Sequence, residues 1–452
     1  MVNSLRVMLI VLATAFLVMP VAGCCLFTDL LPVPDGADNG DDNGDDNGDD
    51  NGDDNGDDNG DDNGDETLVI VKTDIDVRHD AALKTGTDLI AFGTAVGGST
   101  VVGVSYITPS EAPTVGTPVP NTELYSNKAF AVGGRTIFLA GSNIGALAFQ
   151  VSVFDVDTAT ITQTFDTTDI RLCSIPVAAG DTGHIQADGD YCVVICDQST
   201  VTDGLIIKVI DVSGDAPALI AFTNNPAGSC FQVDQVAVDA ASQTVVAVAD
   251  DTFFIYDITD PTAAPTEIVS PNGVSDTQIK MNGGYIIALD DQAYPHTILV
   301  NLTTNTIIDL TDGFGIGAVA IGTDVFAFFA DADADDSSGG SQRAAVGTVP
   351  GPGYTKAPLN QYIDGSTVNN GLAGFGGSLD IVPDDSYVFL ANSYLQYSTA
   401  GATFVVPADP EDEDPYACPA WSVDCSLDTV GFKTATTRSD NTATTVGYII
   451  LP

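Results

Sequence analysis

The stretch TVVAVADDTFFIYDITDPTAAPTEI, residues 244–268, contains three short apolar runs separated by Asp-, Thr- and Pro-rich segments. Runs of about four to eight residues rich in Val, Ile, Phe and Tyr, bounded by such segments, are typical of β-strands. The second run ends in Asp257, followed by the aliphatic Ile258 and then by Thr259. An Asp at the end of a strand favours a turn, because its side chain accepts a hydrogen bond from the backbone two residues on. The stretch therefore predicts three consecutive strands.

The pattern of an apolar strand that ends in Asp or Asn recurs along the chain. Three further copies are VSVFDVD (151–157), IKVIDVS (207–213) and TILVNLT (297–303). The Asp or Asn positions of the four copies are 56, 46 and 44 residues apart. A four-stranded blade of a β-propeller repeats about every 40 to 50 residues, so this spacing predicts a propeller.

The stretches 244–268 and 204–220 (GLIIKVIDVSGDAPALI) resemble LVIVD-type repeats and the related YVTN-like propeller repeats. The resemblance implies an extracytoplasmic β-propeller, and it brings no common activity with it. Asn301 stands where these repeats have Asp, and the flanking blades lack an Asp or Asn at this position.

The rhythm of strands and turns predicts an all-β fold, a seven-bladed β-propeller over residues 67–452, with six or eight blades left open. Residues 376–396 and 444–451 are expected in the last blade, and 67–74 from the other end of the chain is expected as its fourth strand. This join would remove the free sheet edges that invite aggregation. The segment 408–441 is expected as an insertion in the last blade, on a loop face.

The N-terminal residues 1–23 have the features of a secretory signal. Arg6 is their only Lys or Arg, and the run from Val7 to Val21 is apolar and too short for a membrane span. The sequence Val21-Ala22-Gly23-Cys24 resembles the lipobox of bacterial lipoproteins. The resemblance implies a lipidated Cys24 as the mature N-terminus. We therefore expect an exported, lipid-anchored protein of the cell envelope, at the outer membrane or cell surface if the organism is Gram-negative.

Residues 24–66 include six tandem copies of Asn-Gly-Asp-Asp, which offer no apolar side chain to bury. Such a segment is predicted to be a disordered acidic linker. The formal net charge of the chain is −50, and residues 67–452 alone hold 46 acidic and 12 basic residues. A field of this sign repels nucleic acid and attracts cations or basic partners. Nucleic acid is therefore excluded as a partner.

Cysteines provide candidate cross-links, because an exported chain meets an oxidising compartment. Cys418 and Cys425 enclose only six residues, so a small local disulfide loop is predicted between them. Cys192 and Cys196 lie in a strand-like run, which would hold them too far apart to bridge each other. The partners of Cys173, Cys192, Cys196 and Cys230 stay open, and so does the alternative that they are buried thiols.

Asp331, Asp333 and Asp335 alternate between two predicted strands of the sixth blade. Oxygen ligands on alternate residues are a feature of calcium loops. However, Asp336 stands where a calcium hand has Gly, and Gln342 stands where it has the closing Glu. Two interpretations stay open: a calcium site and an acidic hairpin tip. No other cofactor is expected.

The repeated Asp155, Asp211 and Asp257 are interpreted as turn-making residues, and no catalytic residue is predicted. The chain is expected to be a binding or interaction module for a protein or glycan ligand, and an enzymatic role is the less favoured one. The alternatives are a cell-envelope hydrolase that acts on polysaccharide with an Asp pair in the central channel, and a calcium-binding structural surface protein. A deep channel lined by convergent Asp residues would favour the enzyme, and a plugged one the module.

Overall fold

The computed structural model divides the chain into two compact units, residues 1–63 and 64–452. The described residues all belong to the second unit: 68–77, 81–95, 102–109, 113, 115–120, 125–143, 148–165, 185–195, 207–223, 235–249, 251–274, 279–290, 296–310, 319–331, 342–356, 378–392, 394–399, 404, 420–435 and 444–451. The expected signal 1–23, Cys24 and the acidic linker therefore lie outside the described residues. Among the residues that are described, no helix is long and apolar enough to cross a membrane.

The described residues form 31 strands, which group into eight sheets. Each sheet is a blade. The blades are numbered around the ring from the one that begins with β2, and the strands of each blade are given from the axis outward. Blades 1 to 4 contain β2 (Leu83–Gly86), β3 (Leu89–Ala95), β4 (Val102–Ile107) and β5 (Thr117–Pro118); β6 (Tyr125–Gly133), β7 (Thr136–Asn143), β8 (Ala148–Asp155) and β9 (Thr160–Phe165); β10 (Ile185–Asp188), β11 (Tyr191–Ile195), β12 (Ile207–Asp211) and β13 (Ala218–Ala221); and β14 (Gln235–Asp239), β15 (Thr244–Ala249), β16 (Thr252–Asp257) and β17 (Thr266–Val269). Blades 5 to 8 contain β18 (Ile279–Asn282), β19 (Tyr285–Leu289), β20 (Thr297–Asn301) and β21 (Thr306–Asp309); β22 (Val319–Ile321), β23 (Val325–Asp331), β24 (Gln342–Thr348) and β25 (Tyr354–Lys356); β26 (Ser378–Ile381), β27 (Val388–Asn392) and β28 (Tyr394–Ser398); and β29 (Ala420–Cys425), β30 (Val430–Ala435), β31 (Thr444–Ile450) and β1 (Val69–Asp76).

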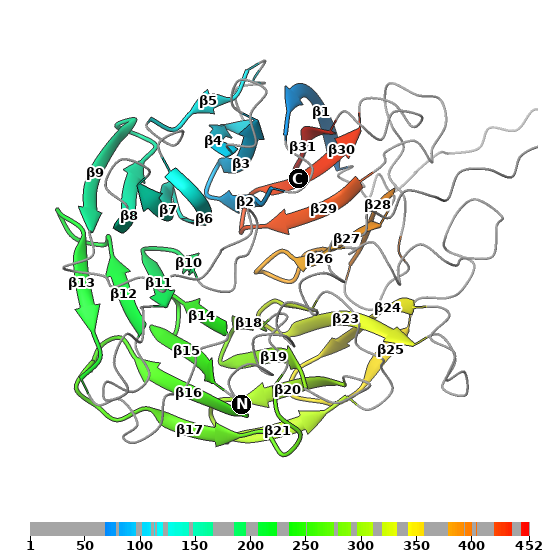
Figure 1. Cartoon of the computed structure of the whole chain (residues 1–452). Helices are drawn as coiled ribbons and strands as arrows, with labels where there is room; N and C mark the ends of the chain where they lie inside the picture. Colours follow the sequence, from blue (N-terminus) through cyan, green and yellow to red (C-terminus); the bar gives the residue numbers. More distant parts are fainter. Residues whose placement is uncertain are drawn as a thin grey trace, which may run out of the picture. The chain divides into compact units, whose positions relative to one another are not determined.

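The blades of this unit follow one another around a common axis (Figure 1). The first strand of every blade is the innermost one, and each inner strand contacts the inner strands of the two neighbouring blades. The circle closes because β29 of blade 8 contacts β2 of blade 1. This part of the chain is therefore a β-propeller with eight blades.

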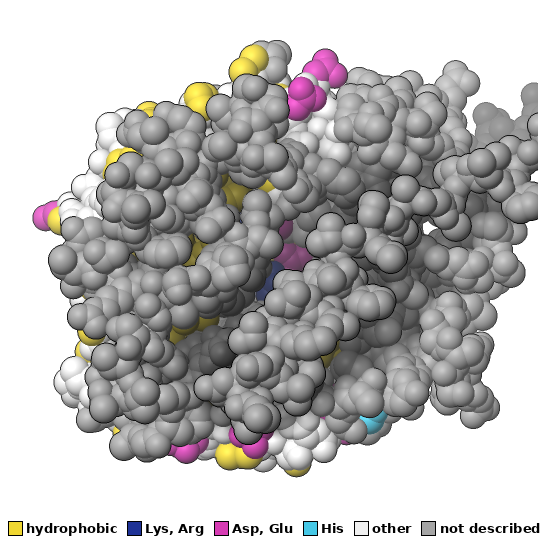
Figure 2. Space-filling model, in the orientation of Figure 1, with side chains coloured by type: hydrophobic (Ala, Val, Ile, Leu, Met, Phe, Trp, Pro, Cys, Tyr) yellow, Lys and Arg dark blue, Asp and Glu magenta, His cyan; other side chains and the backbone are white. Residues whose placement is uncertain are grey.

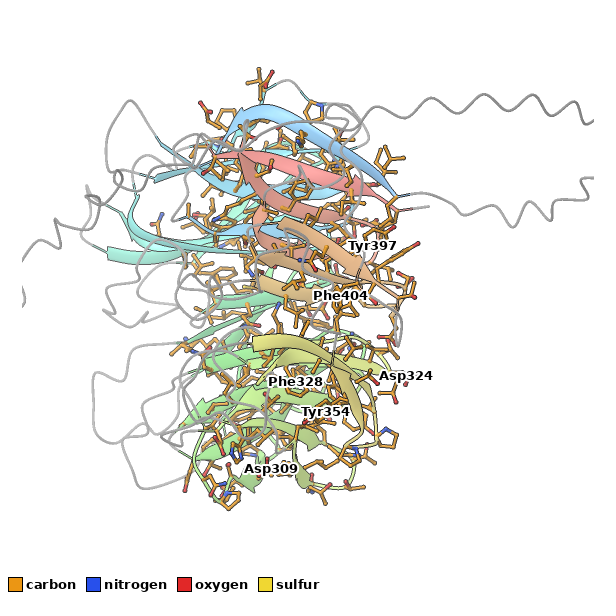
Figure 3. The ribbon with its side chains drawn as sticks, turned by 90° about the vertical axis from the view of Figure 1, so that its right-hand side faces the viewer. Asp309, Asp324, Phe328, Tyr354, Tyr397 and Phe404 are labelled. Carbon is orange, nitrogen blue, oxygen red and sulfur yellow. The ribbon has the colours of Figure 1, made fainter. Side chains whose placement is uncertain are left out.

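Apolar side chains are buried between the blades, with one hydrophobic cluster at each of the eight interfaces. In β15, Val245 packs toward blade 3 while the next residue, Val246, packs toward blade 5. Both faces of a blade are thus covered, which explains why the central strands are continuously apolar instead of alternating. Figure 3 shows Phe328 and Tyr354 among the packed strands of blade 6, with ring centroids 5.0 Å apart.

The expected join between the two ends of the propeller is confirmed. β1 pairs antiparallel with β31, with Val69 opposite Ile450 and Lys72 opposite Gly447. The third and fourth strands of a blade are joined at one face, as β12 is joined to β13 after Asp211. β1 is the fourth strand of blade 8, so it begins at this face. We call it the turn face.

The expected count of seven blades is wrong, because residues 420–425 and 430–435 are β29 and β30 of the closing blade. They fall within 408–441, the range expected as an insertion. Residues 378–398 instead form blade 7 without a contribution from the C-terminus. The third strand of the closing blade, β31, does not end in Asp or Asn, so this blade carries no repeat signal.

Candidate functional site

Four charged side chains from inner strands gather near the axis. Lys84 lies on β2, Lys280 on β18, Asp380 on β26 and Asp424 on β29, and they come from blades 1, 5, 7 and 8. We call these four residues the axial charge cluster. In the space-filling view, basic and acidic side chains lie side by side near the middle of the ring (Figure 2). Inner strands surround the axis, so side chains that are hundreds of residues apart in the chain can meet there.

Asp424 joins blade 8 to blade 1. Its Oδ1 atom lies 3.1 Å from Nζ of Lys84. Its Oδ2 atom accepts hydrogen bonds from the backbone N–H of Thr85 at 2.7 Å and from the Thr85 hydroxyl at 2.9 Å. Charge-assisted bonds of this kind are about twice as strong as neutral ones. One carboxylate thus holds two consecutive residues of β2.

Asp380 joins blade 7 to blades 5 and 8. Its Oδ1 atom lies 3.6 Å from Nζ of Lys280, and its Oδ2 atom accepts the backbone N–H of Cys425 at 2.8 Å. The Lys280 pair spans blade 6, which lies between the two strands in the ring. The contacts of Asp380 and Asp424 together link blades 5, 7, 8 and 1.

The environment shifts the pKa values of the two aspartates in opposite directions. Burial raises the pKa of Asp380, and the Asp424 charge adds to this effect, while Lys280 opposes it. Burial also acts to raise the pKa of Asp424, but the charges of Lys84 and Lys280 and the N–H of Thr85 outweigh it, so this pKa is lowered. Asp380 is therefore the more basic carboxylate of the pair.

The neighbouring cation and thiol are held in their ordinary protonated forms. The charge of Asp380 raises the pKa of Lys280 despite partial burial. Burial raises the pKa of the Cys425 thiol, and the charges of Asp380 and Asp424 raise it further. A thiol with a raised pKa is a poor nucleophile at neutral pH.

All four carboxylate oxygens of Asp380 and Asp424 have partners within the protein. The lysine side chains keep 24% and 26% of their surface exposed, against 13% and 10% for the aspartates. Two cations and two anions compensate one another, so the cluster is close to neutral in a strongly acidic chain. This arrangement favours a structural role for the two aspartates over a free catalytic carboxylate pair.

The repeated Asp and Asn residues make turns, as expected. The side chain of Asp211 accepts the N–H of Ser213 at 2.9 Å, and that of Asp257 accepts the N–H of Thr259 at 2.8 Å. Asn301 does the same with Thr303 at 2.9 Å. In blade 2, Asp155 instead accepts the N–H of Thr158, three residues on, at 3.0 Å.

The other expected sites lie at the limit of the described residues or beyond it. Asp331 is the last residue of β23 and its side chain is not described, and Asp333 and Asp335 lie outside the described residues. Within the described part of the chain, no group of three or more His, Cys, Asp and Glu side chains could hold a metal ion. The calcium site stays a prediction.

The predicted Cys418–Cys425 disulfide also stays a prediction, because Cys418 lies outside the described residues. Cys425 carries a free thiol in the structure. Cys192 is a free, fully buried thiol that packs between blades 2 and 3. A buried thiol was one of the two alternatives expected for it.

The axial charge cluster was not predicted from the sequence. No local signal marks Lys84 or Lys280, because lysines away from the axis also lie in strands, such as Lys208 on β12. The positions of the partners have no local signal either, because Lys84 and Asp424 are 340 residues apart. Only the closed ring brings them together.

No family model matches this chain, and no curated protein matches it either. Solved structures match over most of its length at low identity. A prolyl endopeptidase is 11% identical with a TM-score of 0.48, over 80% of this chain and 53% of the other, so this chain spans about half the length of that enzyme. The β-propeller domain of the Trilobed protease from Pyrococcus furiosus is 9% identical with a TM-score of 0.43, over 69% of this chain and 89% of that one. Hydrazine synthase from Kuenenia stuttgartiensis is 12% identical with a TM-score of 0.37, over 83% and 96%. At these identities no activity is transferred to this chain.

Proposed function

We propose that this chain is an exported β-propeller, anchored to the membrane through a lipidated Cys24, that acts as a binding module for a protein or glycan of the cell envelope. The observation that carries the proposal is the state of the axial aspartates. Every carboxylate oxygen of Asp380 and Asp424 is engaged by a lysine, an N–H or a hydroxyl of the protein itself. Carboxylates used in this way fasten blades together, which suits a rigid scaffold that presents loops to a ligand.

The topology supports a direction for binding. β1 begins at the turn face with Val69, so the propeller begins on that side. The connections between the second and third strands, and those between successive blades, run at the opposite face. We place ligand binding at this opposite face, which is the one farther from the point where the proposed anchor segment joins the propeller.

Anchoring is tested by metabolic labelling with alkynyl palmitate in a bacterial host that exports the full chain. The wild-type chain is expected to incorporate the label, and Cys24→Ser is expected to lose it and leave the membrane fraction. Cys25→Ser is the matched control and should keep the label. Equal labelling of the wild type and Cys24→Ser would contradict the anchor.

Binding is tested with the fluorescently labelled Cys24→Ser chain on isolated cell envelopes from the source organism. The proposal predicts saturable binding that unlabelled chain displaces. Treating the envelopes with protease or with periodate then distinguishes a protein ligand from a glycan. Binding that neither saturates nor is displaced would contradict the proposal.

The runner-up, a hydrolase acting on envelope polysaccharide, is favoured by one specific observation. Asp380 has a raised pKa and Asp424 a lowered one, and carboxylates whose pKa values are driven apart are the pattern of a general acid and its partner base. In this alternative Asp380 would be the acid and Asp424 the base or nucleophile. Both would first have to exchange their partners within the protein for substrate.

A further inference from the structure

The boundary between blades 8 and 1 is where the two ends of the propeller meet. In the other blades, all strands follow one another along the chain, and the chain then continues into the next blade. In blade 8, the outer strand β1 comes from the N-terminal side and is held to β31 by pairing alone, while residues 77–82 lead from β1 to β2. If β1 left the sheet, no direct chain connection would join blade 1 to blade 8. The ring would then depend on non-covalent contacts at this boundary.

The first fastening at this boundary is the strand pairing of β1 with β31. Four consecutive residues, Val69 to Lys72, pair with Ile450 to Gly447, and the register then shifts before Asp76 pairs with Thr445. The Thr73 hydroxyl donates to the carbonyl of Val446 at 2.7 Å. The pairing begins at Val69, which is also the end of β1 that a pull on the N-terminal segment loads first.

A second fastening lies at the inner end of the same boundary. Asp424 holds Lys84 and Thr85 through the three contacts described above. Beside it, the Ser426 hydroxyl donates to the carbonyl of Gly86 at 2.9 Å. These five residues, Lys84, Thr85, Gly86, Asp424 and Ser426, form what we call the inner clasp. None of them belongs to β1 or β31, so the inner clasp does not depend on the outer pairing.

We propose that the inner clasp is a second lock on the propeller, which keeps the ring closed after β1 has been pulled out of blade 8. The order of elements along the chain carries this inference. A pull on the N-terminal segment reaches β1 first and β2 next, and β2 is the strand that the clasp ties to β29. The pull would therefore detach β1 at the rim and then meet the charged contacts of Asp424 near the axis. The anchored propeller would then have an intermediate state in which β1 has left blade 8 and the inner clasp still holds blades 8 and 1 together.

The assumption that the protein is pulled through its N-terminal segment rests on the proposed anchor at Cys24. The inner clasp itself does not depend on that anchor. The experiment is a single-molecule pull with magnetic tweezers on the mature chain from residue 24, held through an N-terminal biotin in place of the lipid. The second handle is an azide-bearing residue substituted for Glu267, which is exposed on β17 of blade 4, on the other side of the ring. A failure of palmitate labelling would refute the anchor and leave this measurement meaningful.

The wild type is expected to extend in two steps. The first releases residues 69–82, whose fully extended length of at most about 50 Å is the upper limit of this step. A long-lived peeled state follows before the ring opens. Asp424→Ala should leave the first step unchanged and shorten the lifetime of the peeled state roughly tenfold or more, since it removes charge-assisted hydrogen bonds. Lys84→Met, which keeps the aliphatic stem, should act in the same direction if Asp424→Ala does not fold.

Asp211→Ala is the matched control, because it removes an aspartate that bonds only to its own turn in blade 3 among the contacts shown. It should leave both steps unchanged. A wild-type chain that loses β1 and opens the ring in a single step would overturn the proposal. So would a peeled state whose lifetime is the same in the wild type and in the clasp variants.

Discussion

The Nζ atom of Lys280 lies 3.6 Å from Oδ1 of Asp380, although the two residues belong to blades 5 and 7 of the ring. The pair reaches across the inner end of blade 6, so the strands next to the axis are held by more than contacts between immediate neighbours. Removing one member of a buried pair leaves the other charge uncompensated, which costs more than the pair itself contributes. Single substitutions in the axial charge cluster should therefore have measurable effects on stability.

Lys280→Met is expected to destabilise the propeller by about 2 kcal/mol at pH 7. Lys280 opposes the rise that burial causes in the pKa of Asp380, so without it this pKa rises further. A carboxyl with a raised pKa contributes stability in acid that is lost as the pH increases through the folded-state value. The deficit of the variant should therefore be large at pH 7 and small at pH 3, as measured by urea unfolding. Arg135→Met, which removes an exposed ion pair with Asp157 instead of a buried one, is the control, and an equal deficit of Lys280→Met at both pH values would contradict the assignment.

Asp424→Asn tests the aspartate of the axial charge cluster whose pKa is lowered instead of raised. The pKa of Asp424 is lowered from its ordinary value of 3.8, so its charge stabilises the fold above that value. This contribution is lost as the pH falls through the folded-state pKa. The variant should unfold more easily than the wild type at pH 7, by about 2 kcal/mol, and the two should converge as the pH falls below the folded-state pKa of Asp424. Asp211→Asn serves as the control, because an Asn side chain can still accept the N–H of Ser213. Curves that stay parallel down to low pH would show that the charge of Asp424 does not stabilise the fold.

Gly447→Ala is expected to destabilise the closing blade by about 1–3 kcal/mol, as overpacked cores do. Gly447 on β31 pairs with Phe432 on β30, and a Cβ atom at this position would collide with the buried Phe432 ring. Gly353→Ala is the matched control, because a Cβ atom there would have nothing within 4 Å. The measurement is the midpoint of thermal unfolding, which should fall in the first variant only. An unchanged midpoint in Gly447→Ala would show that the Phe432 side chain does not pack against Gly447.

The same glycine and aromatic pairing shows what the sequence could predict and what it could not. In blade 6, Phe326 on β23 pairs with Gly347 on β24, and the same positions of blade 8 hold Phe432 and Gly447. Strands that end in Asp or Asn identified blades 2 to 5, because those residues form turns within a few positions of themselves. Blade 8 has no such turn, and its two inner strands fall within 408–441, the range expected as an insertion, so the expected blade count is one too low. The phenylalanine and glycine pattern could have identified it.

The axial charge cluster was beyond the reach of local patterns for a physical reason. Strand and turn signals depend on neighbours in the sequence, whereas Thr85 meets Asp424 across a separation of 339 residues. A lysine in a strand can be seen in the sequence, yet its partner follows only from which strands are innermost and in what order they surround the axis. In an acidic chain with so many aspartates, the composition gives no means of choosing Asp380 and Asp424.

We propose that the axial aspartates hold the ring together and that the protein binds its ligand without cleaving it. To test this, the full chain is incubated with a panel of bacterial envelope polysaccharides and the release of reducing ends is measured. We expect no release above background for the wild type, and unchanged background with lower stability for Asp380→Asn and Asp424→Asn. Release by the wild type that is lost in a folded Asp380→Asn variant would contradict it and establish the hydrolase.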